Sequence, residues 1–206
     1  ERGLSLDQAA FDAAMEAQRD RARAASRFGV DLRGGADLGT VTTFEGYEHL
    51  VTTSKVVALL KDGVTVSQLQ AGEQGEVILE ATPFYAESGG QVGDAGSIAA
   101  AGLTFEVEDT QTSGDQFLHI GRLVSGEVHP GTVVDCQVDS ERRRRTRLNH
   151  SATHLMHAAL RRVLGEHVQQ KGSLVSADRL RFDFSHGESI SAQQIRDIEH
   201  RVNREI

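Results

Sequence analysis

Short runs of β-branched residues, separated by turn residues, fill the chain between Thr40 and Asp139. Two of these runs flank an Asp62-Gly63 pair, which is a strong signal for a tight hairpin turn. The runs that we expect to form strands are residues 55–60, 64–69, 76–81, 103–108, 116–123 and 132–138. Many short strands at this spacing predict a small antiparallel β-barrel.

A helical pattern precedes this region. Residues 6–28 are rich in alanine, follow a Ser5/Gln8 pair with capping-box spacing and end before Gly29. Their apolar stripe is narrow, so we expect a helix that packs on another part of a longer protein. The glycine-rich residues 33–39 then indicate a linker.

Helical spacing returns after the strand region. Residues 142–164 predict a long helix that Gly165 ends, and residues 180–184 alternate apolar and polar side chains as a strand does. A last helix begins at Ser191 and Gln194, a second capping-box pair, and no capping residue follows it. We therefore expect that the sequence was cut from a longer protein.

Together these elements predict an α+β fold, in which a helix precedes an antiparallel β-barrel subdomain and an α/β subdomain follows it. The domain boundaries that we expect are residues 1–30 for the linker helix, 38–139 for the barrel and 140–206 for the α/β subdomain.

The sequence has no apolar stretch of about 18 or more residues, and its first residues lack the basic-then-apolar pattern of a secretory signal. Its single cysteine, Cys136, cannot form an internal disulfide, which agrees with a reducing compartment. We interpret Cys136 as a core residue of a strand. These features predict a cytoplasmic protein with no membrane partner.

A formal net charge of -8 argues against diffuse binding of nucleic acid, because phosphate affinity comes mainly from lysine and arginine. Any contact with RNA must therefore be local. A cluster of basic residues offers one candidate patch, formed by Arg142, Arg143, Arg144, Arg145 and Arg147. These side chains either contact RNA phosphates or form a solvated helix face that is paired with acidic residues.

His150 and His154 lie four residues apart in the predicted helix and so project from one face, with Cβ atoms roughly 6 Å apart. This spacing can hold one zinc ion, although a stable site needs about three or four protein ligands. Two ordinary surface or hydrogen-bonded histidines have the same spacing. We interpret His157, one turn further along, as a supporting residue. No glutamate lies between the pair, which disfavours a metalloprotease site.

The glycine-rich residues 88–96 are a second candidate binding element. Glycine has no Cβ, so such a backbone can approach a phosphate or a ribose closely and donate its N–H groups. A plain barrel loop rich in glycine is the alternative interpretation.

Taken in order, several segments resemble the middle of alanyl-tRNA synthetases over nearly the whole chain. The segments that carry this resemblance are residues 11–23, 43–47, 82–94, 149–155, 167–173 and 180–186. Residues 82–94, with the sequence TPFYAESGGQVGD, match the editing-domain loop of the family with high specificity. Such a series in order is stronger than any single motif.

The resemblance implies an editing region that hydrolyses seryl- or glycyl-tRNA(Ala) at the acceptor end of the tRNA. His150 and His154 match the first two zinc ligands of the family. The other two ligands belong to a Cys-x-x-x-His motif farther along, which this sequence does not contain, so we expect an incomplete zinc site. ATP and magnesium would act in the family's ATP-binding core, before Glu1.

The resemblance also implies further site residues. Gln170 and Thr153 match positions that are associated in the family with the editing pocket. The residues that match the loop beside this pocket are Glu87, Ser88, Gly89, Gly90 and Gln91. A synthetase pocket built for alanine cannot easily exclude glycine or strongly reject serine. In this interpretation the editing pocket must therefore recognise the glycine or serine that the first pocket admits.

Two other functions stay open from the sequence. A free-standing trans-editing deacylase of the same superfamily would share the histidine pair, although the leading helix favours the synthetase. A non-catalytic RNA-binding module would instead use the arginine cluster, and its histidines would be structural.

Overall fold

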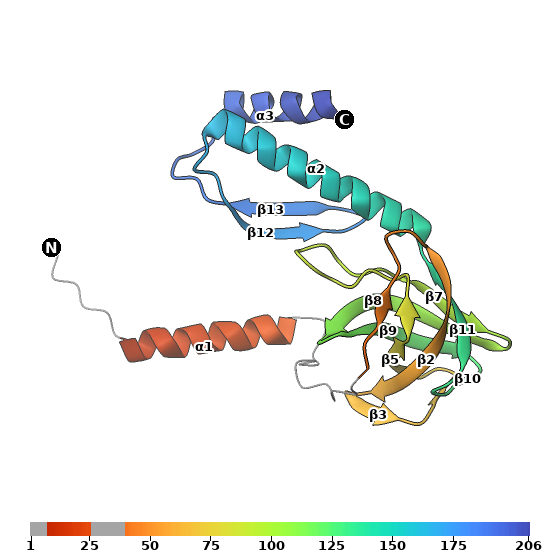
Figure 1. Cartoon of the computed structure of the whole chain (residues 1–206). Coiled ribbons are helices and arrows are strands. Elements are labelled where there is room, and N and C mark those ends of the chain that lie inside the picture. Colours follow the sequence, from red (N-terminus) through yellow and green to blue (C-terminus); the bar gives the residue numbers. More distant parts are fainter. Residues whose placement is uncertain (1–7, 26–39) are drawn as a thin grey trace. The chain divides into compact units, whose positions relative to one another are not determined.

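The computed structural model describes residues 8–25 and 40–206, and the chain separates into two compact units, Glu1–Gly35 and Ala36–Ile206. In the first unit, α1 (Gln8–Ala25) is the predicted alanine-rich helix (Figure 1). The predicted ends of this helix, Ser5 of its capping-box pair and the 33–39 linker lie outside the described residues. The boundary expected near residue 140 falls inside the second unit and stays a prediction.

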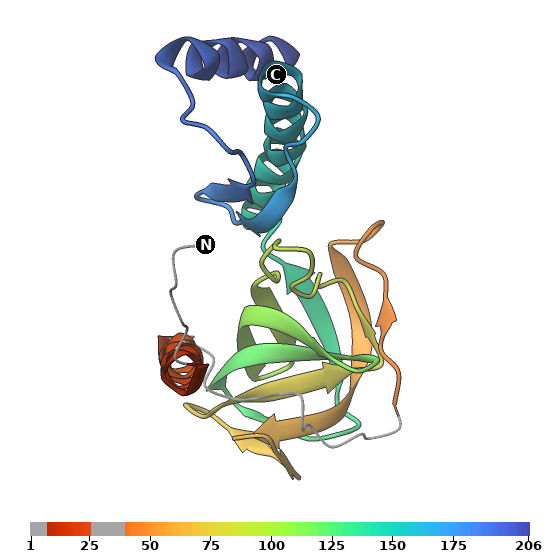
Figure 2. The same ribbon diagram turned by 90° about the vertical axis from the view of Figure 1, so that its left-hand side faces the viewer.

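The second unit begins with the barrel that the strand pattern predicts. Its strands are β2 (Val51–Lys61), β3 (Val64–Val66), β5 (Gln74–Leu79), β7 (Gly96–Ala100), β8 (Leu103–Ser113), β9 (Gln116–Ser125) and β11 (Val133–Val138). They pair in the order β11-β7-β8-β9-β5-β2-β3, and β11 also pairs with β2. The antiparallel sheet therefore closes on itself, as Figure 2 shows.

Two short strand pairs complete the barrel unit. β1 (Thr43–Phe44) runs parallel to β6 (Ala81–Thr82), and β4 (Leu69–Gln70) runs antiparallel to β10 (Glu127–Val128). The sequence predicted one strand over residues 64–69, whereas the structure divides it between β3 and β4. It also missed β7, because glycine, serine and alanine have low strand propensity. Pairing with β8 and β11 on its two sides stabilises β7 instead.

The predicted hairpin at Asp62-Gly63 is confirmed. Both residues have positive φ, 53° for Asp62 and 75° for Gly63, as a type I′ turn requires. The turn joins β2 to β3, whose register pairs Lys61 with Val64.

The core lies inside the barrel and follows the alternation of its strands. In β11, Val134, Cys136 and Val138 are buried, while the residues between them are exposed. Cys136 is therefore the core residue that the sequence predicted, and burial raises the pKa of its thiol to about 12. The largest fully buried apolar side chains include Phe84, Phe105, Leu59 and Leu69.

The rest of the unit consists of α2 (Ser140–Leu164), β12 (Gln170–Val175), β13 (Leu180–Phe184) and α3 (Ala192–Glu205). β12 and β13 form an antiparallel hairpin along one side of α2, and α3 packs on the same helix (Figure 1). These elements confirm the predicted α+β fold class.

Local signals set the ends of these helices. Asp139 caps α2 by accepting a hydrogen bond from the backbone of Arg142, and Gly165 ends the helix as predicted. The capping box of Ser191 and Gln194 is also present at the start of α3. β12 was not predicted, because the residues QKGSLV contain no β-branched run; its pairing with β13 makes it a strand. Within the described residues, no helix has the length and apolar character needed to cross a membrane.

Candidate functional site

The predicted histidine pair lies on α2. The rings of His150 and His154 are stacked, with centroids 5.0 Å apart and an angle of 17° between their planes. His150 is half-buried and His154 is exposed. In residues 8–25 and 40–206, no group of three or more His, Cys, Asp or Glu side chains is placed to hold a metal ion. The pair thus has the donor type that zinc prefers but is too small to complete a site by itself.

Gln91 orients the first of these rings. Its Oε1 lies 2.6 Å from Nδ1 of His150, and the Gln91 side chain is buried. An amide oxygen only accepts hydrogen bonds, so Nδ1 carries the ring proton and the lone pair of Nε2 is left for another ligand. Metal-binding histidines are commonly oriented in this way by a partner on the second ring nitrogen.

The glycine-rich loop that contains Gln91 connects β6 to β7 and lies against β12. The backbone N–H of Val175 donates to the carbonyl of Gly90 at 2.7 Å, and the N–H of Val92 donates to the carbonyl of Val175 at 3.0 Å. Gly90 has a φ of 88°, and a Cβ there would lie 2.5 Å from the carbonyl oxygen of Ser173. Only glycine allows this approach, so Gly90 has a structural reason to be glycine.

The other predicted loop residues form a tight turn. Ser88 and Gln91 exchange backbone hydrogen bonds of 3.1 and 3.0 Å, and Gly89 between them faces open space with a φ of 61°. Glu87 accepts a side-chain hydrogen bond from Gln111 at 2.9 Å. The structure thus brings Gly90, Gln91 and His150 together, with Glu87, Ser88 and Gly89 in the exposed part of the same turn.

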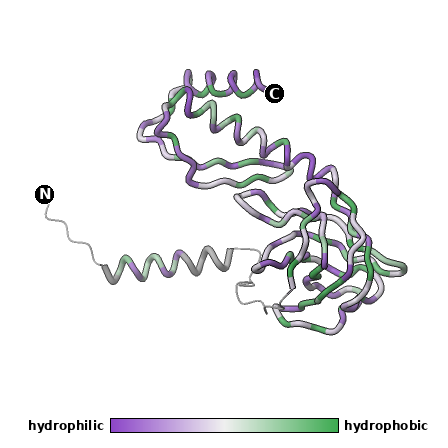
Figure 3. The backbone as a smooth tube through the Cα atoms, viewed as in Figure 1, coloured by the Kyte–Doolittle hydropathy of each residue, from purple (hydrophilic) through white to green (hydrophobic). Residues whose placement is uncertain are grey.

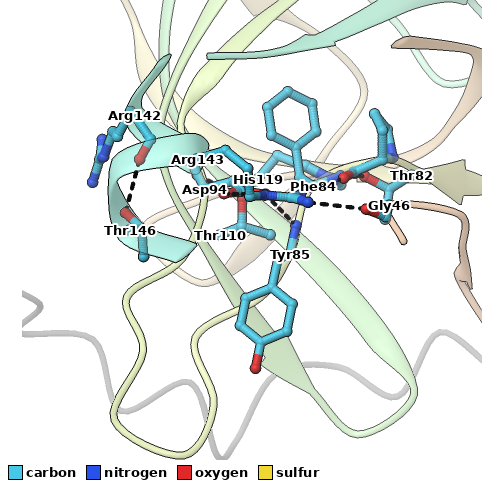
Figure 4. A network of polar contacts seen from close by, with 11 residues as sticks. Gly46, Thr82, Phe84, Tyr85, Asp94, Thr110, His119, Arg142, Arg143 and Thr146 are labelled. Atoms are coloured by element: carbon cyan, nitrogen blue, oxygen red, sulfur yellow. Dashed lines mark hydrogen bonds and ion pairs between the residues drawn. The ribbon is translucent and has the colours of Figure 1, made fainter. Parts of the chain in front are cut away.

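Arg143 fastens the start of α2 to the barrel (Figure 4). Its Nε donates to both carboxylate oxygens of Asp94, at 2.8 and 2.7 Å. Its two Nη atoms donate to the carbonyls of Gly46 and Pro83, each at 2.9 Å. Both side chains of the ion pair are buried, so Arg143 holds the start of the helix on the barrel and exposes little of its side chain to solvent.

The start of α2 is hydrophilic (Figure 3), but the remaining arginines of the cluster differ in their partners and exposure. Arg144 forms an exposed ion pair with Glu141 at 2.8 Å, and Arg145 forms one with Asp178 at 2.7 Å. Arg142 is half-buried and donates to the carbonyl of Glu108 at 3.4 Å. Arg147 is exposed and has no hydrogen-bond or ion-pair partner in the described part of the chain.

Thr153 and Gln170 occupy different surroundings. Thr153 is buried, and its hydroxyl donates to the carbonyl of Asn149 in its own helix at 2.8 Å. Gln170 is exposed at the first position of β12, whereas Gly90 contacts the last position, Val175. These two ends are about 17 Å apart along the strand. The structure therefore does not place Gln170 beside the Gln91 and His150 contact.

His157 lies on the side of α2 that faces the hairpin. Its ring packs on Phe182, with centroids 5.0 Å apart. Its Nε2 is buried and has no hydrogen-bond partner within the described residues. The ring thus packs against β13.

A cleft beside His150 contains residues that the sequence analysis did not single out. It has a volume of about 690 Å³, and its walls include Tyr47, Tyr85, Arg147 and His150. Tyr47 as a whole residue is 86% exposed, and its ring packs edge-to-face on that of Phe44, with centroids 5.0 Å apart. The two tyrosines of the chain come from separate segments, so only the folded barrel brings them to one cleft.

Known proteins match the chain over its whole length. The family described as tRNA synthetases class II (A) matches residues 1–142. The chain is 54% identical over 206 residues to an alanine–tRNA ligase of Pseudomonas entomophila, and 56% identical to one of Pseudomonas syringae pv. tomato. An alanine–tRNA ligase of Methylococcus capsulatus is 56% identical over 207 residues. Each match covers 100% of this chain but only 24% of the relative's length.

Proposed function

The chain belongs to the alanyl-tRNA synthetase family of class II tRNA synthetases, and from this we propose that its second unit is an editing region. In this proposal it hydrolyses the ester bond that joins serine or glycine to the acceptor end of tRNA(Ala). The charging reaction, with its ATP and magnesium, belongs to other parts of the longer relatives, of which this chain spans about a quarter.

The observation that carries the proposal is the contact between the glycine-rich loop and the histidine pair. Gln91 holds His150 with Nε2 available, His154 stacks on His150, and Gln91 and His150 line a cleft that is open to solvent. A reacting ester needs such an accessible group held in one orientation. Backbone hydrogen bonds also join the loop to β12 at Gly90, so the position of Gln91 relative to His150 does not depend on a single side chain.

Zinc enters the proposal only with additional ligands. The described residues supply two imidazoles and do not complete a zinc site. We propose that a Cys-x-x-x-His motif farther along a longer protein supplies the rest, as the family resemblance implies. When bound, the ion would activate water or fix the terminal adenosine.

Selectivity gives the editing reaction its physical reason. A synthetase pocket shaped for alanine cannot exclude the smaller glycine, and it rejects serine, which has one added hydroxyl, only weakly. A second site must therefore recognise what the first admits. In the proposal, Thr153 and Gln170 shape that site. Gln170 reaches it only if the acceptor end extends along β12, since Gln170 lies at the far end of this strand from Gly90.

The test is deacylation of seryl-tRNA(Ala) by the full-length protein. His150→Ala and His154→Ala should each lower the rate at least about 10-fold to 100-fold, which is the range that loss of a supporting group around a metal ligand produces. Charging of tRNA with alanine should stay at the native rate. The matched control is His200→Ala, an exposed histidine of α3 outside the proposed site. Native deacylation by both His150→Ala and His154→Ala would refute the assignment.

A further inference from the structure

The cleft beside His150 is formed by three separate segments. Its walls come from the turn after β1, the loop between β6 and β7, and the first turns of α2. Its volume of about 690 Å³ lies within the range of about 300–1,000 Å³ that is typical of small-ligand sites. His150 belongs both to the lining of the cleft and to the histidine pair, so the cleft and the pair adjoin each other.

The aromatic side chains of the cleft are held in place by a stack behind them. Phe44 contacts Tyr47 at 5.0 Å and Tyr85 at 6.2 Å, and it stacks on Phe117 at 5.6 Å with an angle of 10°. Figure 4 shows the Tyr85 ring pointing away from the ion pair of Arg143. Within the described residues, neither tyrosine hydroxyl has a hydrogen-bond partner. Tyr47 thus presents an exposed aromatic ring that packs on Phe44, and an accessible ring is what base stacking needs.

Of the arginines that line the cleft, two are neutralised and one is available. Arg143 is neutralised by Asp94 and Arg144 by Glu141. Arg147 also lines the cleft, and it is exposed and unpaired within the described part of the chain. The other lining carboxylate, from Glu48, repels anions, so any phosphate must bind at Arg147 and not across the whole cleft. A guanidinium can meet a phosphate through two parallel hydrogen bonds.

We propose that this cleft binds one single-stranded nucleotide of RNA, with its base stacked on Tyr47 and Tyr85 and its phosphate on Arg147. The assignment of this nucleotide to a particular part of the RNA rests on the proposed editing function. Since His150 lines the cleft, the bound nucleotide belongs to the unpaired acceptor end, next to the nucleoside that carries the ester. With a net charge of -8 on the protein, this contact is local and weak by itself.

The chain contains an internal reporter for this site. It has two tyrosines, Tyr47 and Tyr85, and no tryptophan, so its intrinsic tyrosine fluorescence reports on the cleft. A single-stranded RNA of four nucleotides should quench this fluorescence on titration. Fluorescence anisotropy of the same RNA, labelled at its 5′ end, gives the affinity independently.

Two substitutions test the two contacts separately. Tyr47→Leu should weaken RNA binding about tenfold, whereas Tyr47→Phe, which keeps the ring, should bind as the native chain does. Arg147→Gln should weaken binding and lower the slope of log affinity against log salt by about 0.7, the value for one phosphate contact on a single strand. Arg161→Gln, about 21 Å further along α2, is the matched control and should change neither.

Native affinity and native salt slope in both Tyr47→Leu and Arg147→Gln would overturn the inference, provided that circular dichroism shows native folding. The full-length protein separates this inference from the proposed function. If it deacylates seryl-tRNA(Ala) and Tyr47→Leu leaves KM unchanged, the cleft assignment is wrong and the editing function stands. If it does not deacylate, yet RNA binding depends on Tyr47 and Arg147, the editing function is wrong and the cleft assignment stands.

Discussion

Arg143 at the start of α2 forms a buried ion pair with Asp94, a residue of the loop between β6 and β7 that lies 49 positions earlier in the sequence. The same loop contains Gln91, and the same helix contains His150 about two turns later. The ion pair therefore sets how the loop and the helix lie relative to each other. The contact between Gln91 and His150 depends on that arrangement.

Removing this ion pair should destabilise the protein. Arg143→Ala leaves the Asp94 carboxylate buried without its cation, which costs about 3–5 kcal/mol in other proteins with a buried pair. Urea denaturation should show this loss in the free energy of unfolding. Arg144→Ala, which removes only an exposed ion pair with Glu141, should leave the unfolding midpoint unchanged. Equal midpoints for the two variants would contradict a structural role of Arg143.

The buried His119 should make stability depend on pH. Nδ1 donates to the carbonyl of Val77 and Nε2 accepts from the hydroxyl of Thr82, both at 2.7 Å, and burial lowers the pKa of the ring to about 4. The unfolded chain, with a pKa near 6.5, therefore takes up the proton first as the pH falls. The contribution of His119 is complete above pH 6.5, and about 3 kcal/mol of it is lost by pH 4.

His119→Gln isolates this effect, because glutamine does not titrate. The stability difference between the native protein and this variant should shrink as the pH falls from 6.5 to 4. Glu76, whose pKa is raised by burial, titrates in both proteins and cancels from the difference. Urea denaturation of both proteins at several pH values measures this stability difference. A difference that stays constant with pH would mean that His119 is not the responsible group.

Gly89 and Gly90 both have positive φ, but only Gly90 also lies too close to a neighbouring backbone to accept a Cβ. Gly89→Ala should cost about 1 kcal/mol, because its φ of 61° is unfavourable for alanine but its surroundings are open. Gly90→Ala should cost more, about 2–3 kcal/mol, since its new Cβ would also collide with the backbone of Ser173. Thermal unfolding measures both. Only Gly90→Ala should also shift the NMR signals of His150, and equal effects of the two variants would argue against close seating of the loop.

Zinc affinity should follow the number of ligands. At the candidate site the 206-residue chain offers the two imidazoles of His150 and His154, which leave most of the coordination of the ion to water, so it should bind zinc weakly there. A longer protein with the Cys-x-x-x-His motif should bind zinc far more tightly, and His150→Ala in that protein should remove most of the gain. Competition with a chelator measures both affinities. Tight, stoichiometric zinc in the 206-residue chain would show that the ligands are misassigned.

Features that depend on neighbours in the sequence were predicted from the sequence alone. The hairpin at Asp62-Gly63, the end of α2 at Gly165 and the capping box of Ser191 all rest on residues within about four positions of one another. The barrel was predicted from the spacing of short β-branched runs between turn residues, and the family from motifs in order. β7 and β12 were missed, because their own residues do not favour strands and pairing with distant strands makes them so.

The tertiary structure alone decided what each candidate site residue contacts. In the sequence, the arginines from Arg142 to Arg147 form one cluster; in the fold, Arg143 is buried on Asp94 and Arg147 lines a cleft. Gln91 and His150 are 59 positions apart, yet one hydrogen bond joins them. Such contacts depend on how α2 packs against the barrel, and the spacing of residues along a chain carries no information about the packing of two separate elements.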